Sequence, residues 1–435
     1  MKKLSILLAS ILLIIAAGCG NGNGNGGSNG GNNGTSPTTE AGQKEETATP
    51  KKDVTIKVFQ FKVEIADALN RMAEAYEKET GVKVQVETHG GGEDYNALLR
   101  AEIAAGSEPE IFNAEGFAAL EAYYDRATDL SGEPWAKDVI ESAAAPAKVD
   151  GKLLGMPMNI EGYGIFYNKE LFAKAGITEL PKTLTELEAV VAKLEAAGIT
   201  PFVTTNEWWS IGHHTINVAL AEQPDPVAFV EGTKNGTELF KNNEIFQKWT
   251  KYVDLVFNHS QKDKLTTDYA TQVATFASGK AAMIQQGNWI QGDIDKVGKL
   301  DIGLLPIPID DSGKARIYTG PANFWIVNSK SKNAEEAKAF LNWMVTSDTG
   351  KSYITKEFKF IPALTSITAT TEDVGQMGAA VSEQAASAGG WHWGRYPDGV
   401  TQGWGAAMQE YQGGQINKDQ LLDKFNKTIS DIVQK

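Results

Sequence analysis

Hydrophobic and polar residues alternate in two short segments near the start of the main body of the chain. Over residues 54–58 and again over 82–86, every second residue is Val or Ile, which is typical of half-buried strands. Between them, over 65–76, apolar residues recur at helical spacing, and Gly81 stands where such a helix would end. A strand, a helix and a strand within about thirty residues predict a parallel βαβ unit, and hence an α/β fold class.

The same patterns predict further elements downstream. We expect a helix over 95–105, a short strand over 110–113, a helix opening at 181–187 and a helix over 334–345. No internal repeat of fixed period and no second linker follow Asp53. We therefore expect two lobes joined by close-packed crossings, and not a string of separate domains.

The N-terminal segment has the layout of a secretory signal. Lys2 and Lys3 precede an uncharged apolar stretch over 4–17, which is shorter than the about 20 residues that a membrane-spanning helix needs. Small residues lead to Cys19, and this junction resembles a bacterial lipobox, in which the cysteine becomes the lipidated first residue of the mature protein. We therefore expect a signal peptide over 1–18 and lipidation at Cys19. The alternative is an ordinary signal peptide beside a free thiol.

The segment after Cys19 has a composition unsuited to folding. Residues 20–53 contain no Leu, Ile, Phe or other aromatic residue, so burial cannot offset the entropy of ordering them. We expect residues 19–53 to be the lipidated cysteine and a flexible tether. Within it, 26–30 formally matches the G-x-S-x-G motif of hydrolases, but the strand and helix that this motif requires are not predicted there.

Composition and charge exclude several classes of function. The 435 residues carry 41 Lys and Arg against 55 Asp and Glu, a formal net charge of −14, which argues against a nucleic-acid partner. Removal of the two lysines of the signal peptide would bring the charge to about −16. A single cysteine excludes a disulfide within the chain.

Signals for catalysis or metal binding are weak. Gly350-Lys351-Ser352 matches the end of a phosphate-binding loop, but Val345 stands where that motif needs a glycine. His213 and His214 are adjacent, whereas metal ligands on one helix face are three or four residues apart. We therefore expect no metal and no cofactor. Paired carboxylates of a glycosidase remain an alternative, because such pairs meet in space and not in sequence.

The tryptophans fall into two groups by their neighbours. Those with apolar neighbours at helix or strand spacing are assigned to the core: Trp249, Trp325 and Trp343. Those beside polar residues and glycines are candidates for a binding surface: Trp208, Trp209, Trp289, Trp391, Trp393 and Trp404. Trp208 and Trp209 cannot both enter a core from one strand, since successive side chains point to opposite faces. Flat rings beside hydrogen-bonding groups suit a sugar, although such rings can also hold loops together.

Several segments carry a resemblance to a known family. They are GKLLGMPMNIEGYGIFYNKELF over 151–172, FASGKAAMIQQGNW over 276–289, and the pair 319–327 and 331–341. These segments resemble the extracellular solute-binding proteins of bacterial sugar ABC importers, of which the maltodextrin-binding proteins are the best-known members. Their order and spacing match over nearly all of residues 54–435.

The resemblance implies an α/β, two-lobed periplasmic-binding-protein fold of type II-like architecture, with the ligand cleft between lobes joined by hinge crossings. The crossings are expected near 159–162, 319–323 and 355–361. Lobe 1 would then comprise 54–160 plus about 319–355, and lobe 2 would comprise 161–318 plus about 356–435. Rotation at the short crossings would close the rigid lobes over a sugar.

The resemblance also implies a set of ligand-binding residues. Trp289 matches the principal stacking tryptophan of the family, and Glu207 and Trp209, beside Trp208, match an acidic residue and an aromatic of the cleft. The remaining candidates lie in the C-terminal region, the first lobe and the crossings: Trp391, Trp393, Trp404, Asn113, Glu115, Phe61, Asn159, Glu161 and Asn323. The loop Gly90–Asp94 could contribute but is not placed by the resemblance.

The expected function is therefore non-enzymatic capture of a sugar and its delivery to the membrane permease subunits of an ABC importer. The number of aromatic candidates favours an oligosaccharide over a monosaccharide. We expect a monomer held by its lipid on the outer face of the cytoplasmic membrane, as in a Gram-positive bacterium. The alternatives are a secreted carbohydrate-active enzyme, or a protein of the same fold for a polyamine, ion or peptide. The tryptophan-rich C-terminal third argues against ions, which need oxygen ligands.

Overall fold

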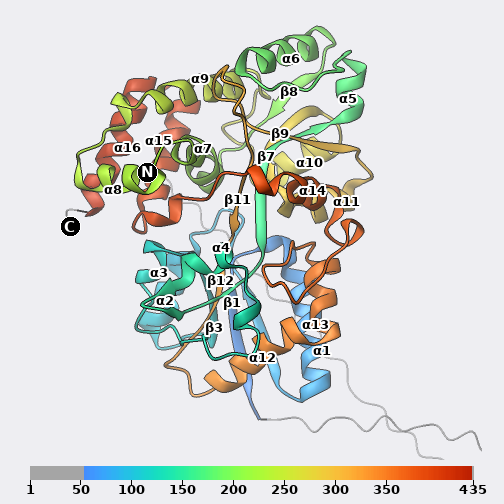
Figure 1. Cartoon of the computed structure of the whole chain (residues 1–435). Helices are drawn as coiled ribbons and strands as arrows, with labels where there is room; N and C mark the ends of the chain where they lie inside the picture. The colour runs from blue at the N-terminus through green and yellow to red at the C-terminus, as the bar shows by residue number, and fades with distance from the viewer. Residues whose placement is uncertain (1–52, 434–435) are drawn as a thin grey trace, which may run out of the picture. The chain divides into compact units, whose positions relative to one another are not determined.

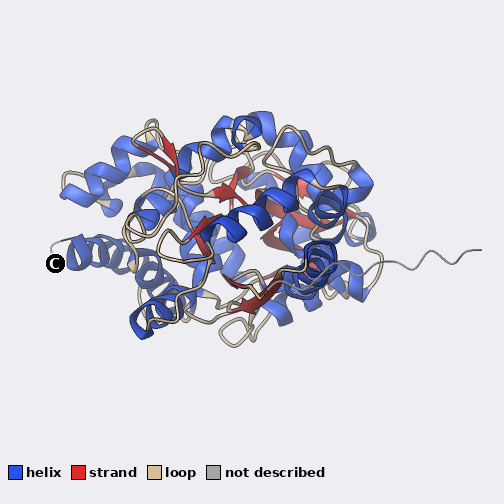
Figure 2. Ribbon diagram, turned by 90° about the horizontal axis from the view of Figure 1, so that it is seen from below, coloured by secondary structure: helices blue, strands red, loops and turns tan. Residues whose placement is uncertain are grey.

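The computed structural model describes residues 53–433. The expected signal peptide, Cys19 and the expected tether up to residue 52 lie outside the described residues. Figure 1 shows the described elements in two groups, one built around β1, β3 and β12 and the other around β7, β8 and β9. In Figure 2, most of the strands lie in the interior with helices around them.

The first group is built on a mixed sheet of five strands in the order β2-β1-β3-β12-β6. Its strands are β1 (Thr55–Gln60), β2 (Lys83–Thr88), β3 (Ile111–Ala114), β6 (Met156–Pro157) and β12 (Phe324–Val327). Strand β1 pairs in parallel with both β2 and β3, whereas β12 is antiparallel to β3. The βαβ unit predicted from the hydrophobic pattern is confirmed.

The second group is built on the order β10-β7-β9-β8, with β11 also paired to β7. Its strands are β7 (Ile160–Asn168), β8 (Thr200–Val203), β9 (Ala281–Gly287), β10 (Ile302–Leu305) and β11 (Tyr318–Pro321). Only β8 and β9 are parallel to each other. A separate two-stranded sheet joins β4 (Lys148–Val149) and β5 (Lys152–Leu153).

Helices of both groups begin and end as their sequences direct. Helix α1 ends at Gly81, which adopts the left-handed conformation that glycine tolerates at φ 75°. Helix α6 opens with a capping box in which Thr183 and Glu186 satisfy each other's backbone amides. The helices of the first group are α1 (Ala66–Thr80), α2 (Tyr95–Ala105), α3 (Ala118–Glu121), α4 (Glu141–Ala144), α12 (Ala334–Thr346) and α13 (Asp348–Ser352). Those of the second group are α5 (Lys169–Lys174), α6 (Leu184–Ala196), α7 (Thr215–Ala221), α8 (Pro226–Asn235), α9 (Glu244–Asn258), α10 (Tyr269–Ala277), α11 (Gln291–Val297), α14 (Thr371–Gln384), α15 (Val400–Gln412) and α16 (Lys418–Val433).

Two separate hydrophobic clusters divide the described chain into two lobes. The first-lobe cluster takes its buried side chains from 56–158 and again from 324–367. The second-lobe cluster takes them from 163–318 and again from 377–429. The chain therefore passes three times between the lobes.

The third passage lies later than the expected position at 355–361. Phe358 and Phe360 are both buried in the first-lobe cluster, with ring centroids 5.3 Å apart. Ile361 then bridges to Ile160, and the first-lobe cluster continues to Ile367. Phe358 and Phe360 thus pack in the first lobe. The chain enters the second lobe only after Ile367.

Candidate functional site

A cavity of about 170 Å³ lies between the two lobes. The first lobe contributes the segment 61–64 after β1, the loop 90–96 and Glu115. The second lobe contributes Glu161 at the start of β7 and a set of aromatic side chains. Most of the residues that the sequence singles out line this cavity: Phe61, Glu115, Glu161, Trp208, Trp209, Trp289, Asn323, Trp391 and Trp393.

Trp404 does not reach the cavity. Its side chain is 0% exposed, and its indole Nε1 donates to the Phe425 carbonyl at 3.2 Å. It packs edge-on against Tyr396, with ring centroids 4.6 Å apart. Val400, Trp404 and Met408 are buried at helical spacing along α15, so Trp404 belongs to the hydrophobic core of the second lobe.

Asn113 and Asn159 are also buried behind the cavity wall and do not line it. The Asn113 Oδ1 accepts the backbone N–H of Phe61 at 3.2 Å. The Asn159 Nδ2 donates to Glu161 Oε1 at 3.0 Å. Both amides therefore position residues that line the cavity.

Glu207 lies beside the cavity and faces the first-lobe glycine loop. It accepts the backbone N–H of Tyr269 at 3.3 Å, and burial raises the pKa of its carboxyl. A Cβ added to Gly92 would lie 3.3 Å from Glu207 Oε2. Gly92 also has φ +110°, a backbone conformation that favours glycine. The loop Gly90–Asp94, which the resemblance does not place, is part of the cavity wall.

The paired tryptophans enter the cavity from a helix. Trp208 and Trp209 occupy the first helical residues before the π-helix Ser210–His214. The strand argument for this pair is therefore wrong, because neighbouring residues on a helix project about 100° apart. Both rings line the cavity, and Trp209 packs against Tyr269 at 5.6 Å. Of the tryptophans assigned to the core, Trp249 and Trp325 are buried, whereas Trp343 is only partly buried.

Two neighbouring residues, Gln286 and Gly287, fix the position of the Trp289 indole. Its indole Nε1 donates to Gln286 Oε1 at 3.0 Å. A Cβ on Gly287 would lie 1.9 Å from the six-membered ring of Trp289. The indole therefore lies flat over a residue that must be glycine. With 9% of its surface exposed, Trp289 presents a small ring face to the cavity.

His213 and His214 also line the cavity, a role that sequence reasoning missed. His213 stacks on Trp393 with centroids 5.4 Å apart, and His214 lies 4.8 Å from Trp289. Burial lowers the pKa of His213 to about 3 and that of His214 well below 6.5, so both are neutral near pH 7. His213 Nε2 and His214 Nδ1 are buried without hydrogen-bond partners. The adjacent Trp208-Trp209 pair was the available signal.

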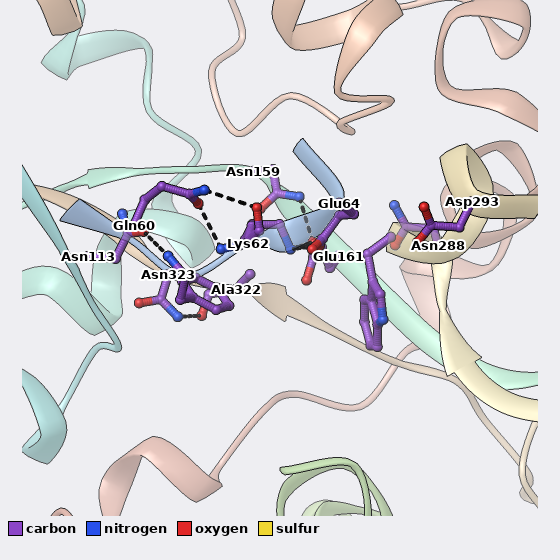
Figure 3. Close-up of polar contacts among 12 residues, drawn as sticks. Gln60, Lys62, Glu64, Asn113, Asn159, Glu161, Asn288, Asp293, Ala322 and Asn323 are labelled. Carbon is purple, nitrogen blue, oxygen red and sulfur yellow. Dashed lines mark hydrogen bonds and ion pairs between the residues drawn. The ribbon is translucent and has the colours of Figure 1, made fainter. Parts of the chain in front are cut away.

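A buried ion-pair cluster connects the lobes at the cavity wall (Figure 3). Lys62 Nζ lies 2.6 Å from Glu161 Oε1 and 2.7 Å from Glu64 Oε1. Burial alone would lower the pKa of Lys62, but the charges of the two carboxylates raise it. Burial raises the pKa of Glu64. Sequence reasoning missed Lys62 and Glu64, because ion partners distant in sequence leave no pattern.

Glu115 completes the polar side of the cavity. Burial raises the pKa of its carboxyl to about 7. Its Oε1 lies 3.8 Å from His213 Nδ1. Among residues 53–433, no group of three or more His, Cys, Asp or Glu side chains could hold a metal ion. The cavity therefore combines ring faces with carboxylates and unpaired nitrogens, which suits a ligand rich in hydroxyl groups.

Comparison with known proteins identifies the family. The sequence profile of the bacterial extracellular solute-binding proteins matches residues 62–351. The chain belongs to this family. It is 23% identical over 367 residues to the melibiose/raffinose/stachyose-binding protein MelE of Bacillus subtilis, covering 81% of this chain and 79% of MelE. It is 26% identical over 304 residues to a maltooligosaccharide ABC transporter solute-binding lipoprotein of Streptococcus pneumoniae, covering 65% of this chain and 66% of that protein.

Solved structures of solute-binding proteins share the fold. A chitin oligosaccharide binding protein superposes with a TM-score of 0.76 at 23% identity, covering 88% of this chain and 99% of the other. The solute-binding protein RafE in complex with raffinose superposes with a TM-score of 0.75 at 21% identity, covering 87% and 99%. The expected two-lobed α/β fold of this family is confirmed. Within residues 53–433, the helices are too short or too polar to span a membrane.

Proposed function

We propose that this solute-binding protein captures an oligosaccharide between its lobes and delivers it to the membrane permease of an ABC importer. The observation that carries the proposal is the composition of the cavity, in which indole rings of the second lobe face polar groups of the first. The relatives named above bind raffinose-type sugars and maltooligosaccharides, as their names state.

In the proposed complex, each kind of lining residue has a distinct role. Trp289, Trp208 and Trp209 pack on the C–H faces of sugar rings. Glu115, Glu161 and Asn323 accept or donate hydrogen bonds to hydroxyl groups. Because these residues come from both lobes, the bound sugar stabilises the closed arrangement by contacts made to both at once.

Isothermal titration of the mature protein against oligosaccharides and monosaccharides tests this function. The panel is raffinose, stachyose, maltotetraose, xylotetraose, chitotetraose and their constituent monosaccharides. We expect at least one oligosaccharide to bind and to remain chemically unchanged. Binding of monosaccharides alone would refute the oligosaccharide proposal. Release of smaller sugars from a bound oligosaccharide would identify an enzyme instead.

The lipid anchor is proposed from the lipobox-like junction before Cys19 and from the lipoprotein among the relatives. Cys19 would hold a monomer on the outer face of the cytoplasmic membrane, with residues 20–53 as the tether. Expression of the full chain and of Cys19→Ala in a Gram-positive host tests this. The parent should fractionate with membranes, and the variant should be released into the medium or remain unprocessed.

A further inference from the structure

A second cavity, of about 440 Å³, adjoins the first between the lobes. It is lined by 115–117, Ser142, Ala145 and Pro146 of the first lobe, by 319–322 and Phe324 at the crossing, and by Ala385 and 388–395 of the second lobe. Glu115, Trp391 and Trp393 line both cavities. The indole pair, with centroids 4.6 Å apart, therefore stands where the two spaces meet.

Small residues make up much of the wall of this second cavity. Its lining is rich in residues without long side chains: Gly116, Ala145, Gly320, Ala385, Ala388, Gly389, Gly390 and Gly394. Gly116 and Gly394 meet across the lobes, since a Cβ on Gly394 would lie 3.2 Å from the Gly116 carbonyl oxygen. The space is thus enclosed by backbone from both lobes.

Arg395 is the cationic residue of this lining. Its guanidinium carbon lies 3.8 Å from the centroid of the Phe117 ring, in a cation–π contact between the lobes. Its Nε is buried without a hydrogen-bond partner. Phe117 has φ 58°, a left-handed conformation that is strained for an aromatic residue. The Phe117 backbone is thus strained in the conformation that places its ring against the Arg395 guanidinium.

Two neighbouring side chains share this lack of partners. Trp391 Nε1 and His392 Nδ1 are also buried without hydrogen bonds, within the segment that carries Arg395 Nε. Tryptophan and arginine nitrogens can only donate, so they require acceptor oxygens. The guanidinium of Arg395 lies over the Phe117 ring and also feels the negative charge of Glu231. A planar guanidinium can bind a carboxylate by two parallel hydrogen bonds.

The charges differ between the two cavities. The first is lined by Glu64, Glu93, Asp94 and Glu161 in addition to Glu115, with Lys62 as its counter-charge. The second has Arg395 and Glu115 as its charged side chains. Burial raises the pKa of Glu115 to about 7 and lowers that of His392 to about 4. The first cavity thus has an excess of carboxylates, whereas the second has one guanidinium and one carboxyl whose pKa is raised, so an anionic group meets less repulsion in the second.

We propose that the second cavity binds an acidic sugar unit, a uronic acid residue at one end of the oligosaccharide, whose carboxylate pairs with Arg395. This inference rests on the proposed function. It extends that function by naming a ligand class, since the acidic unit occupies the cavity at Arg395 and the neutral units pack on the tryptophans of the first cavity. The oligosaccharide would then lie across the Trp391–Trp393 pair in one orientation, with its acidic end in the second cavity.

The test compares matched neutral and acidic oligosaccharides by isothermal titration at 20 mM and 200 mM NaCl. The pairs are xylotetraose with aldotetraouronic acid, maltotetraose with its C6-oxidised form, and raffinose with its C6-oxidised galactose form. We expect the acidic member of at least one pair to bind at least tenfold more tightly than its neutral partner. In Arg395→Gln that difference should disappear, while affinity for the neutral partner stays within threefold.

Lys314→Gln is the matched control, because Lys314 is exposed and lines neither cavity, and the substitution removes the same charge. Thermal unfolding of both variants verifies that they fold. Neutral sugars binding without any preference for an acidic form, or a preference that persists in Arg395→Gln, would overturn the inference and leave the proposed function intact. No binding by any of the six sugars would overturn the inference, and if stachyose and chitotetraose also failed to bind, the proposed function would be overturned as well. Inorganic phosphate or free glucuronate binding as tightly as the acidic oligosaccharide would show a simple anion site and overturn the assignment to a sugar.

Discussion

Lys62 of the first lobe and Glu161 of the second form a buried ion pair, with Nζ and Oε1 2.6 Å apart and each residue 3% exposed. Glu64 shares the same ammonium at 2.7 Å. Two carboxylates removed from water thus depend on one lysine. Desolvation offsets much of the attraction within such a cluster, so its net contribution to stability is small while all three groups are present.

Loss of the Lys62 charge should nevertheless be strongly destabilising, because it leaves buried carboxylates without a counter-charge. In Lys62→Met the two carboxylates remain buried without a cation, and we expect the free energy of unfolding in urea to fall by about 3–5 kcal/mol at pH 7. The double variant Lys62→Met/Glu161→Gln removes one of the stranded charges and should recover part of this loss. A double variant less stable than the single one would contradict the account.

Trp289 should be an affinity residue and Trp404 a stability residue. We expect Trp289→Ala to weaken oligosaccharide binding by roughly 2–4 kcal/mol, since a ring at the cavity is lost. Trp404→Phe should lower the free energy of unfolding by about 1–2 kcal/mol and leave affinity nearly unchanged, because Trp404 lies in the core. Titration and urea unfolding of both variants measure this contrast. Equal affinity of Trp289→Ala and the parent would remove Trp289 from the site.

Gly287→Ala tests whether the backbone beneath Trp289 sets the position of its ring. A Cβ at this position would lie 1.9 Å from the indole, so the ring must move. We expect at least a tenfold loss of affinity, which is about 1.4 kcal/mol. Gly292→Ala is the matched control, since a Cβ there meets nothing within 4 Å and the residue lies in α11 of the same lobe. Comparable losses in the two variants would argue against the positioning role.

We expect the protein to lose stability at acid pH because its buried histidines are held in the neutral form. Burial lowers the pKa of His213 to about 3 in the folded state, below its ordinary 6.5. A depressed histidine pKa contributes stability that is complete above pH 6.5 and is lost as the pH falls towards 3. Between pH 7 and pH 4 this contribution should fall by about 3 kcal/mol.

His213→Gln removes this titration, so its free energy of unfolding should vary less between pH 7 and pH 4 than that of the parent. Urea unfolding at the two pH values gives the comparison. Glu115, 3.8 Å away, acts in the opposite sense, because its raised pKa gives stability that is lost as the pH rises through about 7. A parent and variant with the same pH profile would show that His213 is not held neutral by burial.

Asp398 connects the second lobe to α2 of the first. It accepts from Asn96 Nδ2 at 3.0 Å and forms an ion pair with Arg100. Asp398→Asn should favour the open arrangement, with a larger radius of gyration in small-angle X-ray scattering without ligand and an affinity two- to fivefold lower. The effect is modest because partly exposed ion pairs contribute about 0–1 kcal/mol. Asp423→Asn, which removes an exposed pair within the second lobe, should change neither quantity.

The local fold could be predicted where a pattern repeats along the chain. The spacing of 65–76 and Gly81 foretold α1 and its end, and α2 has the bounds that its sequence predicts. The third crossing could not be placed in this way. Phe358 and Phe360 are equally compatible with either lobe, and only their packing decides.

The sequence predicted the kinds of residue in the candidate site better than it predicted which individual residues belong to it. Trp208 and Trp209 have polar neighbours and line the cavity, whereas Trp404 has such neighbours and still faces the core. Val400 and Met408 lie four residues on either side of Trp404 and are buried with it on α15. This helical spacing of apolar residues was a better guide to the position of Trp404 than the adjacent glycines. His213 enters the cavity through a π-helix, whose extra residue per turn changes the direction of side chains and leaves no clear sequence signal.

The Trp391–Trp393 pair borders both cavities, so it works as a partition with two faces. Any substitution there alters two chambers together, whereas changes at Trp289 or Arg395 alter one. Substitutions in the far wall of one cavity can thus change its ligand preference without affecting the other cavity. Substitutions at Trp391 or Trp393 affect the shape of both. A variant at the partition should shift preferences for both ends of a ligand in a single step.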